Sequence, residues 1–208
     1  MSTYATMFDR IADESRRTDL TAQIKLCIQE AIAHYEVERF WFNLSRSNTF
    51  DTVASQEFYS SSDNAYIDEI LELDTLNITV NSNRYVLEPT TWEQIDRWSV
   101  LASSIGQPTR YCYWAQQIRL YPIPDAAYTV RMQGLFRLST LSANDDTNAW
   151  MVEGERLIRS RASGIFYRQY LRNDVAAARH DKVETEEYAK LMMSIGRRMA
   201  TGTIQPSL

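Results

Sequence analysis

Histidines and cysteines, the side chains most often used as bases, nucleophiles and metal ligands, are scarce in this sequence. The chain of 208 residues holds two of each. His34 stands at the edge of an apolar stripe of helical spacing, and His180 lies in a run of charged residues. We interpret the first as a partly buried structural residue and the second as part of a solvated helix face. Two histidines are too few for most catalytic triads and metal sites.

The cysteines and the motif content lead to the same conclusion. Cys27 and Cys112 lie in apolar or aromatic surroundings without CxxC spacing, so we predict two small buried hydrophobic residues, with a disulfide as the alternative. The signatures of zinc proteases, serine hydrolases, P-loop proteins and dinucleotide-binding folds are missing from the sequence. We therefore predict no catalytic residue, no metal and no cofactor.

Carboxylates are numerous, and paired acids are the usual means of glycoside hydrolysis. That chemistry needs two carboxyl groups roughly 5 to 9.5 Å apart across the bond to be cleaved. No spacing in the sequence selects such a pair, and we interpret the acidic clusters as solvated or subunit-contacting. They comprise Asp63, Asp68, Glu69, Glu72 and Asp74 in one group and Glu184, Glu186 and Glu187 in the other.

Charge is divided unevenly along the chain. Residues 1–149 hold 12 Lys and Arg against 20 Asp and Glu, a net of −8, and residues 150–208 hold 10 against 7, a net of +3, which together give −5. Affinity for nucleic acid comes mainly from clustered Lys and Arg that displace counterions. This acidic body is therefore not expected to coat DNA, whereas its unlike ends favour self-association.

Three arginines, Arg161, Arg168 and Arg172, are spaced seven and four apart and are predicted to line one edge of a helix. One interpretation is a basic stripe that meets an acidic partner or DNA. The other, which we favour because most of the chain is acidic, is a set of ion pairs within a helical bundle. All three are candidate contacts with another subunit or with a partner protein.

Helical patterns occupy both ends of the chain. Ser2 or Thr3 caps a first helix that runs to about Arg16, and a second begins at Thr18 or Asp19. The apolar stripe of the second helix consists of Leu20, Ile24, Cys27, Ile28, Ala31 and Tyr35. From Ala149 helical spacing returns, with a break and a new cap at 173–174 and an end near Gly202.

Short β-branched and aromatic runs fill the middle of the chain. The predicted strands are 40–44, 49–53, 57–60, a hairpin of 70–80 with 84–87, and 110–114, 117–121 and 127–136; a helix near 91–103 interrupts them. The stretch 106–125 combines turn formers with aromatic residues and holds no catalytic group, so we predict a stiff contact element. Its candidate contact residues are Tyr111, Tyr113, Trp114, Arg119 and Tyr121. The alternatives are core packing and, less consistent with the scarcity of lysine, stacking on single-stranded bases.

These elements predict a single domain of the α+β class. Segments 1–39 and 149–200 form a helical bundle, residues 40–140 form an inserted antiparallel β-rich region, and residues 201–208 form an extended C-terminal tail. Hydrophobic residues make up 44% and charged residues 24%, as in a soluble globular protein. No apolar run reaches the roughly 18 residues of a membrane span, and no signal peptide is recognised at the N-terminus, so we expect no membrane and a cytoplasmic site of synthesis.

Several phrases, in order along most of the chain, resemble the head-to-tail adaptor (connector) proteins of tailed bacteriophages. The matching phrases are Glu38-Arg39-Phe40-Trp41-Phe42-Asn43, Thr49-Phe50-Asp51-Thr52, Arg84-Tyr85, Gly106-Gln107-Pro108, Ile118-Arg119-Leu120-Tyr121-Pro122-Ile123-Pro124-Asp125, Trp150 with Leu157-Ile158-Arg159, and Ala200-Thr201-Gly202-Thr203-Ile204-Gln205-Pro206. The turn at 115–117 departs from the family, in which a glycine is frequent.

The resemblance implies a structural virion protein assembled in the host cytoplasm. It implies a ring of twelve copies that docks on the portal protein, seals the filled head, lets double-stranded DNA pass without binding it specifically, and offers the tail or nozzle protein its attachment site. It also implies that the C-terminal tail, with Thr203, Ile204, Gln205 and Pro206, reaches onto the portal. These residues suit an extended peptide laid along a partner surface.

Two other functions stay open from the sequence. One is a tail-associated peptidoglycan hydrolase, for which zymography of variants at Glu69, Glu72 and Glu184 is the test. The other is a protein-interaction module unrelated to phage, which fails to form a complex with a portal.

Overall fold

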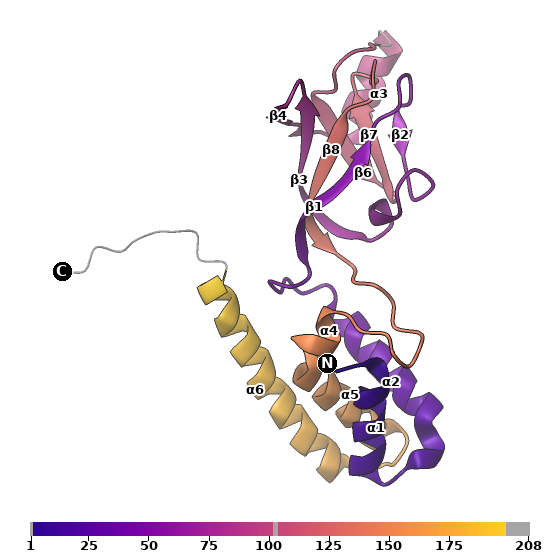
Figure 1. Ribbon diagram of the computed structural model, residues 1–208, viewed down its shortest axis with the longest axis vertical. Helices are drawn as coiled ribbons and strands as arrows, with labels where there is room; N and C mark the ends of the chain where they lie inside the picture. Colours follow the sequence, from indigo (N-terminus) through magenta and orange to yellow (C-terminus); the bar gives the residue numbers. More distant parts are fainter. Residues whose placement is uncertain (1, 102–103, 199–208) are drawn as a thin grey trace, which may run out of the picture. The chain divides into compact units, whose positions relative to one another are not determined.

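The computed structural model describes residues 2–101 and 104–198. Within these residues it has six α-helices and two four-stranded β-sheets, so the expected mixed α+β class is confirmed. The chain divides into two compact units (Figure 1). The β unit consists of residues 44–137, and the helical unit contains the described residues of segments 1–43 and 138–208. No helix in the described part of the chain is long and apolar enough to cross a membrane.

Helices from both ends of the chain build the helical unit. Thr3 caps the first of them through a capping box: its hydroxyl accepts the Thr6 N–H, and the Thr6 hydroxyl accepts the Thr3 N–H. The elements are α1 (Tyr4–Ser15), the 3₁₀ turn η1 (Thr18–Leu20), α2 (Thr21–Tyr35), α4 (Ala149–Val152), α5 (Glu155–Gln169) and α6 (Asp174–Arg198). The first helix, predicted to run to about Arg16, has Ser15 as its last residue. It stops because Arg16, the C-cap, adopts the left-handed conformation with φ of 55°.

Helix α5 is the centre of this unit and packs against both α2 and α6. Its buried face combines large side chains such as Phe166 with small ones such as Ala162 and Gly164. Gly164 allows α6 to come close, because a methyl group at this position would lie 2.9 Å from Asp181 Oδ1. Trp150 and Phe40 complete the core with an edge-on ring contact at 5.5 Å.

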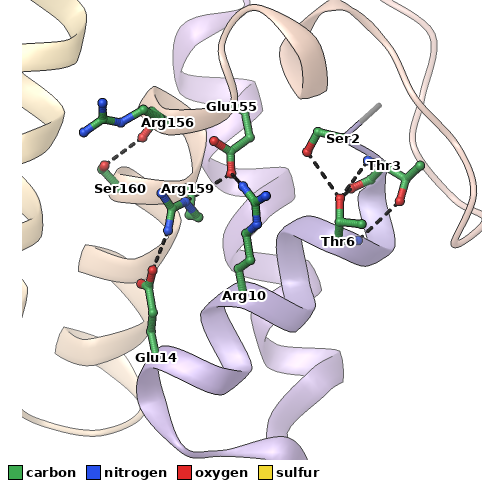
Figure 2. A network of polar contacts seen from close by, with 9 residues as sticks. All are labelled: Ser2, Thr3, Thr6, Arg10, Glu14, Glu155, Arg156, Arg159 and Ser160. Atoms are coloured by element: carbon green, nitrogen blue, oxygen red, sulfur yellow. Dashed lines mark hydrogen bonds and ion pairs between the residues drawn. The ribbon is translucent and has the colours of Figure 1, made fainter.

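Ion pairs join α1 to α5 at the edge of this core (Figure 2). Glu155 Oε1 accepts from Arg10 at 3.0 Å and from Arg159 at 3.1 Å. Arg159 also pairs with Glu14. The four side chains therefore form a chain of alternating charge across the helix interface, in the order Arg10, Glu155, Arg159 and Glu14. Because these side chains are partly exposed, their ion pairs contribute little to the free energy of unfolding. Their main effect is to fix the orientation of α1 on α5.

Two sheets form the β unit, in the strand orders β1-β8-β3-β4 and β2-β7-β6-β5. Among the described strands every pairing is antiparallel except that of β5 with β6. The elements are β1 (Leu44–Asp51), β2 (Phe58–Tyr59), η2 (Ala65–Ile67), β3 (Ile70–Val80), β4 (Asn83–Val86), β5 (Glu88–Pro89), α3 (Trp92–Leu101), β6 (Arg110–Trp114), β7 (Gln117–Tyr121) and β8 (Thr129–Phe136). The sequence predicted these strands without predicting their division into two sheets.

The two sheets share one hydrophobic core. Alternate residues of the first sheet, such as Ile78 and its cross-strand partner Val130, are fully buried, and so are Ile118 and Leu120 of the second. All four belong to one cluster of buried side chains. The inward faces of both sheets therefore pack together as in a β-sandwich.

Gly134 marks the closest approach of β3 and β8. The ladder between these strands shifts register at two places, and Gly134 lies opposite Leu73 between them. A methyl group built on Gly134 would lie 2.1 Å from the carbonyl oxygen of Glu72. Only a residue without a side chain fits this bulged pairing.

The strand predicted at 40–44 is wrong. Residues 41–43 form a turn, and the strand begins at Leu44. The Asn43 side chain causes this, because its Oδ1 accepts the Phe40 N–H at 2.8 Å and its Nδ2 donates to the Glu38 carbonyl at 2.8 Å. Backbone groups that a sheet would have used are taken by a local side chain.

Other boundaries differ by smaller amounts. The strand predicted at 49–53 is the second half of β1, which ends at Asp51, and the one at 57–60 shrinks to β2. The hairpin turn is confirmed at Asn81 and Ser82, which have φ of 49° and 66°. The helix predicted at 91–103 is α3; its last two predicted residues, 102–103, and the helix end predicted at Gly202 lie outside the described residues.

Candidate contact site around the β6–β7 hairpin

The β6–β7 hairpin contains the aromatic contact residues predicted from the sequence, and its strands have the predicted bounds. Five residue pairs form the ladder, from Arg110 opposite Tyr121 to Trp114 opposite Gln117. The two-residue turn consists of Ala115 and Gln116, with φ of 50° and 59°. Such a turn twists with the strands but is usually built with glycine or asparagine, so this tip holds its conformation against a local preference.

Two of the predicted contact residues face the interior. Tyr111 is 5% exposed and belongs to the core of the β unit. Tyr113 is partly buried beside it, and its hydroxyl lies 3.4 Å from the carbonyl oxygens of Ile67 and Ile70, to which it donates. Burial raises the pKa of both tyrosines. They stiffen the hairpin by attaching it to the core and to the segment before β3.

Arg119 is also inside the β unit, on the opposite face of the hairpin, with 4% of its surface exposed. Its Nε donates to Glu57 Oε1 at 2.6 Å, and its Nη1 donates to Asp96 of α3. Its guanidinium lies 5.1 Å from the ring centre of Phe58 and 4.7 Å from that of Trp92. Arg119 thus ties β7 to β2 and α3.

Burial lowers the pKa of Arg119, but the hydrogen bonds that it donates to Asp96 and Glu57 outweigh burial, so that the pKa is raised overall. The guanidinium therefore keeps its charge inside the cluster. A matching arrangement lies further along the hairpin, where Arg110 stacks over Trp98 at 4.7 Å and Trp98 contacts Tyr121 at 5.3 Å. These contacts hold α3 on the sheet.

Trp114 is the candidate that faces solvent. It is 65% exposed at the end of β6, directly before the turn. A large rigid aromatic side chain on a stiff hairpin is the kind of residue that dominates the binding energy of protein interfaces. Of the five residues predicted on this hairpin, Tyr111, Tyr113, Arg119 and Tyr121 pack against other parts of the β unit, and Trp114 faces solvent.

The arginines predicted to form a stripe on one helix do not lie on one helix. Arg161 pairs with Glu184 at 2.7 Å and Arg168 pairs with Asp181 at 2.6 Å, which confirms ion pairing between α5 and α6. Arg172 lies beyond the end of α5, is exposed, and has a φ of 49°. The predicted stripe is wrong at Arg172 because the chain reverses direction between the two helices.

Glu184 is part of a buried polar cluster in the helical unit. Besides Arg161, the Tyr35 hydroxyl donates to Glu184 Oε1 at 2.5 Å, and burial raises the pKa of Tyr35, with the Glu184 hydrogen bond adding to the rise. The carboxylate already has two donors and serves as a structural acceptor. In the β unit, burial raises the pKa of Glu69, while Arg137 opposes the rise and the neighbouring Asp68 adds to it.

Within the residues that the structure describes, no group of three or more His, Cys, Asp or Glu side chains could hold a metal ion. His180 packs against Tyr167 with ring centres 5.2 Å apart, and burial lowers its pKa. Both cysteines are buried and free, as predicted. The predicted portal-contacting residues Thr203, Ile204, Gln205 and Pro206 lie outside the described residues.

Sequence reasoning missed a groove of about 430 Å³ in the helical unit. Its apolar wall includes Trp41, Val152 and Leu191, and its charged rim includes Arg156 and Glu187, whose side chains are 3.4 Å apart. The remaining lining residues are Glu153, Glu155, Leu157, Lys190 and Ser194. The i, i+3, i+4, i+7 spacing of 187, 190, 191 and 194 was the available signal, but it does not distinguish a groove wall from a packed face.

Comparison with protein families decides the identity of the chain. The family model of the SU10 adaptor protein matches residues 2–206. The chain belongs to the SU10 adaptor protein family. No curated protein matches the chain with significance. This membership confirms the resemblance to phage adaptor proteins drawn from the sequence phrases, at the level of the family.

Membership in the SU10 adaptor family makes the protein a structural component of a phage virion. The family acts as an adaptor between portal and tail proteins. A structural role is consistent with the expectation from the sequence that the chain carries no catalytic residue. The geometry of the hairpin agrees as well, because its charged and aromatic side chains other than Trp114 hold elements of the β unit together.

Proposed function

We propose that this protein is a head-to-tail adaptor that forms a ring, of twelve copies, docked on the portal and offering the tail or nozzle protein its attachment site. The observation that carries the proposal is the match of the adaptor family to residues 2–206, nearly the whole chain. DNA passes through the ring without specific binding. Assembly takes place in the host cytoplasm.

The charge of the chain supports passage of DNA. A formal charge of −5 per copy, with only three lysines in the sequence, gives phosphates little to bind. Several arginines are also paired with carboxylates and so are less available to phosphates, among them Arg119, Arg159, Arg161 and Arg168. Salt-dependent retention on DNA is therefore expected to be weak.

Trp114 supports a role for the hairpin in contacts between subunits or with the tail. The residues below it are bonded into the β unit, so this side chain is presented without a cost of ordering a loop. Arg161, Arg168 and Arg172 are proposed as further contacts, with the first two also joining α5 to α6. The proposed domain division keeps 40–140 as the contact-forming insertion between 1–39 and 149–200.

Residues 203–206 are proposed to bind the portal. The segment lacks charge and combines Ile204 with hydrogen-bonding neighbours, which suits an extended peptide on a partner surface. Each copy in a ring would supply one such segment. Weak binding of each segment would therefore add up to a strong attachment of the whole ring to the portal.

Assembly with the portal tests the proposal. The full-length chain is mixed with the portal protein of its phage, and the mass of the product is measured by mass photometry, with negative-stain microscopy for ring symmetry. We expect a complex with as many adaptor copies as portal subunits. A chain that leaves the portal mass unchanged contradicts the adaptor role.

Two matched variants separate the contributions. Deletion of residues 201–208 is expected to abolish portal binding, and unchanged binding would remove only the role of that segment. Trp114→Ser is expected to leave the fold intact, since the side chain is 65% exposed, and to weaken contacts between copies or with the tail.

A zymogram with the full chain as control tests hydrolase activity. Clearing of peptidoglycan that a Glu69, Glu72 or Glu184 variant abolishes would favour the hydrolase.

A further inference from the structure

The groove in the helical unit is built from parts distant in sequence. Trp41 precedes β1, Val152 ends α4, and Leu191 with Ser194 lies on the second half of α6. Val152 is 54% exposed although it is aliphatic, and it faces this groove. Together with Trp41 and Leu191, Val152 gives this concave site an apolar wall on which a peptide can pack.

The charges around the groove are mostly satisfied. Glu187 pairs with Arg156 at 3.4 Å and with Lys190 at 2.7 Å. Glu155 pairs with Arg10 and Arg159. A charged occupant would have to compete with these pairs, whereas an uncharged peptide with one apolar face would lie on Trp41, Val152 and Leu191 without disturbing them.

The sequence directly after α6 has that composition. Residues 199–208 contain no Asp, Glu, Lys, Arg or His. From Thr203 onward polar and apolar residues alternate strictly, with Ile204, Pro206 and Leu208 at every second position. In an extended peptide such residues share one face, which matches a single apolar wall.

The distances allow this segment to reach the groove of its own chain. The structure describes α6 as far as Arg198, and Leu191 lies about 10 Å back along the helix at 1.5 Å per residue. The six residues from Arg198 to Ile204 span about 20 Å when extended, and Gly202 lies where the chain would have to reverse.

We propose that residues 203–208 dock in the groove of the same chain formed by Trp41, Val152 and Leu191, with Ile204 on its apolar wall. This inference rests on the proposed function, because it concerns the same segment that is proposed to bind the portal. The segment is held on the helical unit until the portal displaces it. Docking at the groove and docking on the portal are then mutually exclusive.

A disulfide trap tests the intramolecular docking. Val152→Cys and Ile204→Cys are combined in the full-length chain, which is oxidised, and unreacted thiols are alkylated before non-reducing electrophoresis and intact-mass analysis. The native Cys27 and Cys112 are buried, so they do not interfere. We expect a monomer that has lost two free thiols, formed about tenfold faster than in the control because docking raises the local concentration of the segment at the groove.

The control pairs Ile204→Cys with Met193→Cys, which is 72% exposed on α6 and does not line the groove. Met193 lies two residues from Leu191 on the same helix, so Ile204 can reach both sites, and only docking in the groove favours Val152. Equal trapping in both variants, or no trapping in either, overturns the proposal. Disulfide-linked dimers alone overturn it as well, because the occupant is then the segment of a second copy.

Portal binding separates this inference from the function on which it builds. The oxidised V152C/I204C chain is expected to lose portal binding, and reduction is expected to restore it. If the trap forms and the portal binds the oxidised and reduced forms equally, the two dockings are not exclusive and the holding role is overturned. If the trap forms while neither form nor the unmodified chain binds the portal, the docking stands and the portal-binding role of the segment fails.

Discussion

At the scale of single residues, Arg119 shows how a side chain that looks like a contact can be a structural one. In sequence it lies in an exposed-looking aromatic strand. In the structure its partner Glu57 directly precedes β2 and its partner Asp96 lies on α3. The rings of Phe58 and Trp92 cover its guanidinium. Pairing over such sequence separations is not encoded in any local pattern, so spacing alone could not reveal it.

Replacing Arg119 by alanine should destabilise the β unit by about 3 kcal/mol, because Glu57 loses its partner in a largely buried position and both rings lose their packing. Urea denaturation followed by tryptophan fluorescence measures the change. Arg97→Ala is the matched control, since Arg97 is exposed on α3, the helix that carries the Arg119 partner Asp96, and a shift within about 0.5 kcal/mol is expected. Equal effects of the two substitutions would refute the structural role.

The two cysteines give a second prediction at this scale. Burial raises the pKa of Cys27 to about 12 and also raises that of Cys112, so both stay protonated and unreactive near neutral pH. A thiol reagent should label neither cysteine in the native chain and both in concentrated urea. Rapid labelling of one thiol in the native chain would place that cysteine in an open part of the fold.

At the scale of elements, local patterns predicted where most helices and strands occur. The predicted strands 110–114 and 117–121 match β6 and β7, because both are short runs rich in aromatic and apolar residues and the turn between them is short. The predicted strand at 40–44 failed because the Asn43 side chain occupies the backbone groups of its neighbours. The separation into two sheets, the bounds of β5 and the groove depend on pairings over long sequence separations, and no short window contains them.

Gly134→Ala should destabilise the β unit by about 3 kcal/mol, because the added methyl would lie 2.1 Å from the Glu72 carbonyl oxygen and the backbone has to move. Thermal unfolding followed by circular dichroism detects the loss. Gly106→Ala is the control, since a methyl there meets nothing within 4 Å. If Gly134→Ala melts at the wild-type temperature, the close pairing of β3 and β8 is incorrect.

At the scale of the whole molecule, net charge opposes assembly. Twelve copies in the proposed ring would carry 12 × −5 = −60 formal charges, and repulsion on this scale keeps copies apart unless the portal acts as a template. The predicted division of charge between the two ends of the chain is a property of sequence alone, whereas the pairing of the arginines became visible only in the folded chain.

Salt should therefore promote self-association of the isolated chain. Raising NaCl from about 0.05 to 0.5 M shortens the screening length from roughly 14 to 4 Å, and the weight-average mass from sedimentation at fixed concentration should rise. A mass that falls with salt would show that attraction between unlike ends dominates instead.

The β1–β8 ladder places Leu44 opposite Leu135, so the β unit begins and ends at neighbouring points of one sheet. A segment whose two ends meet can be exchanged for another of any internal length, provided that the new segment brings its own ends together. The helical unit would keep its own hydrophobic core through such an exchange. Related chains can therefore acquire a different attachment module by replacing one continuous stretch of sequence, and a designer can graft a foreign hairpin domain at the same seam.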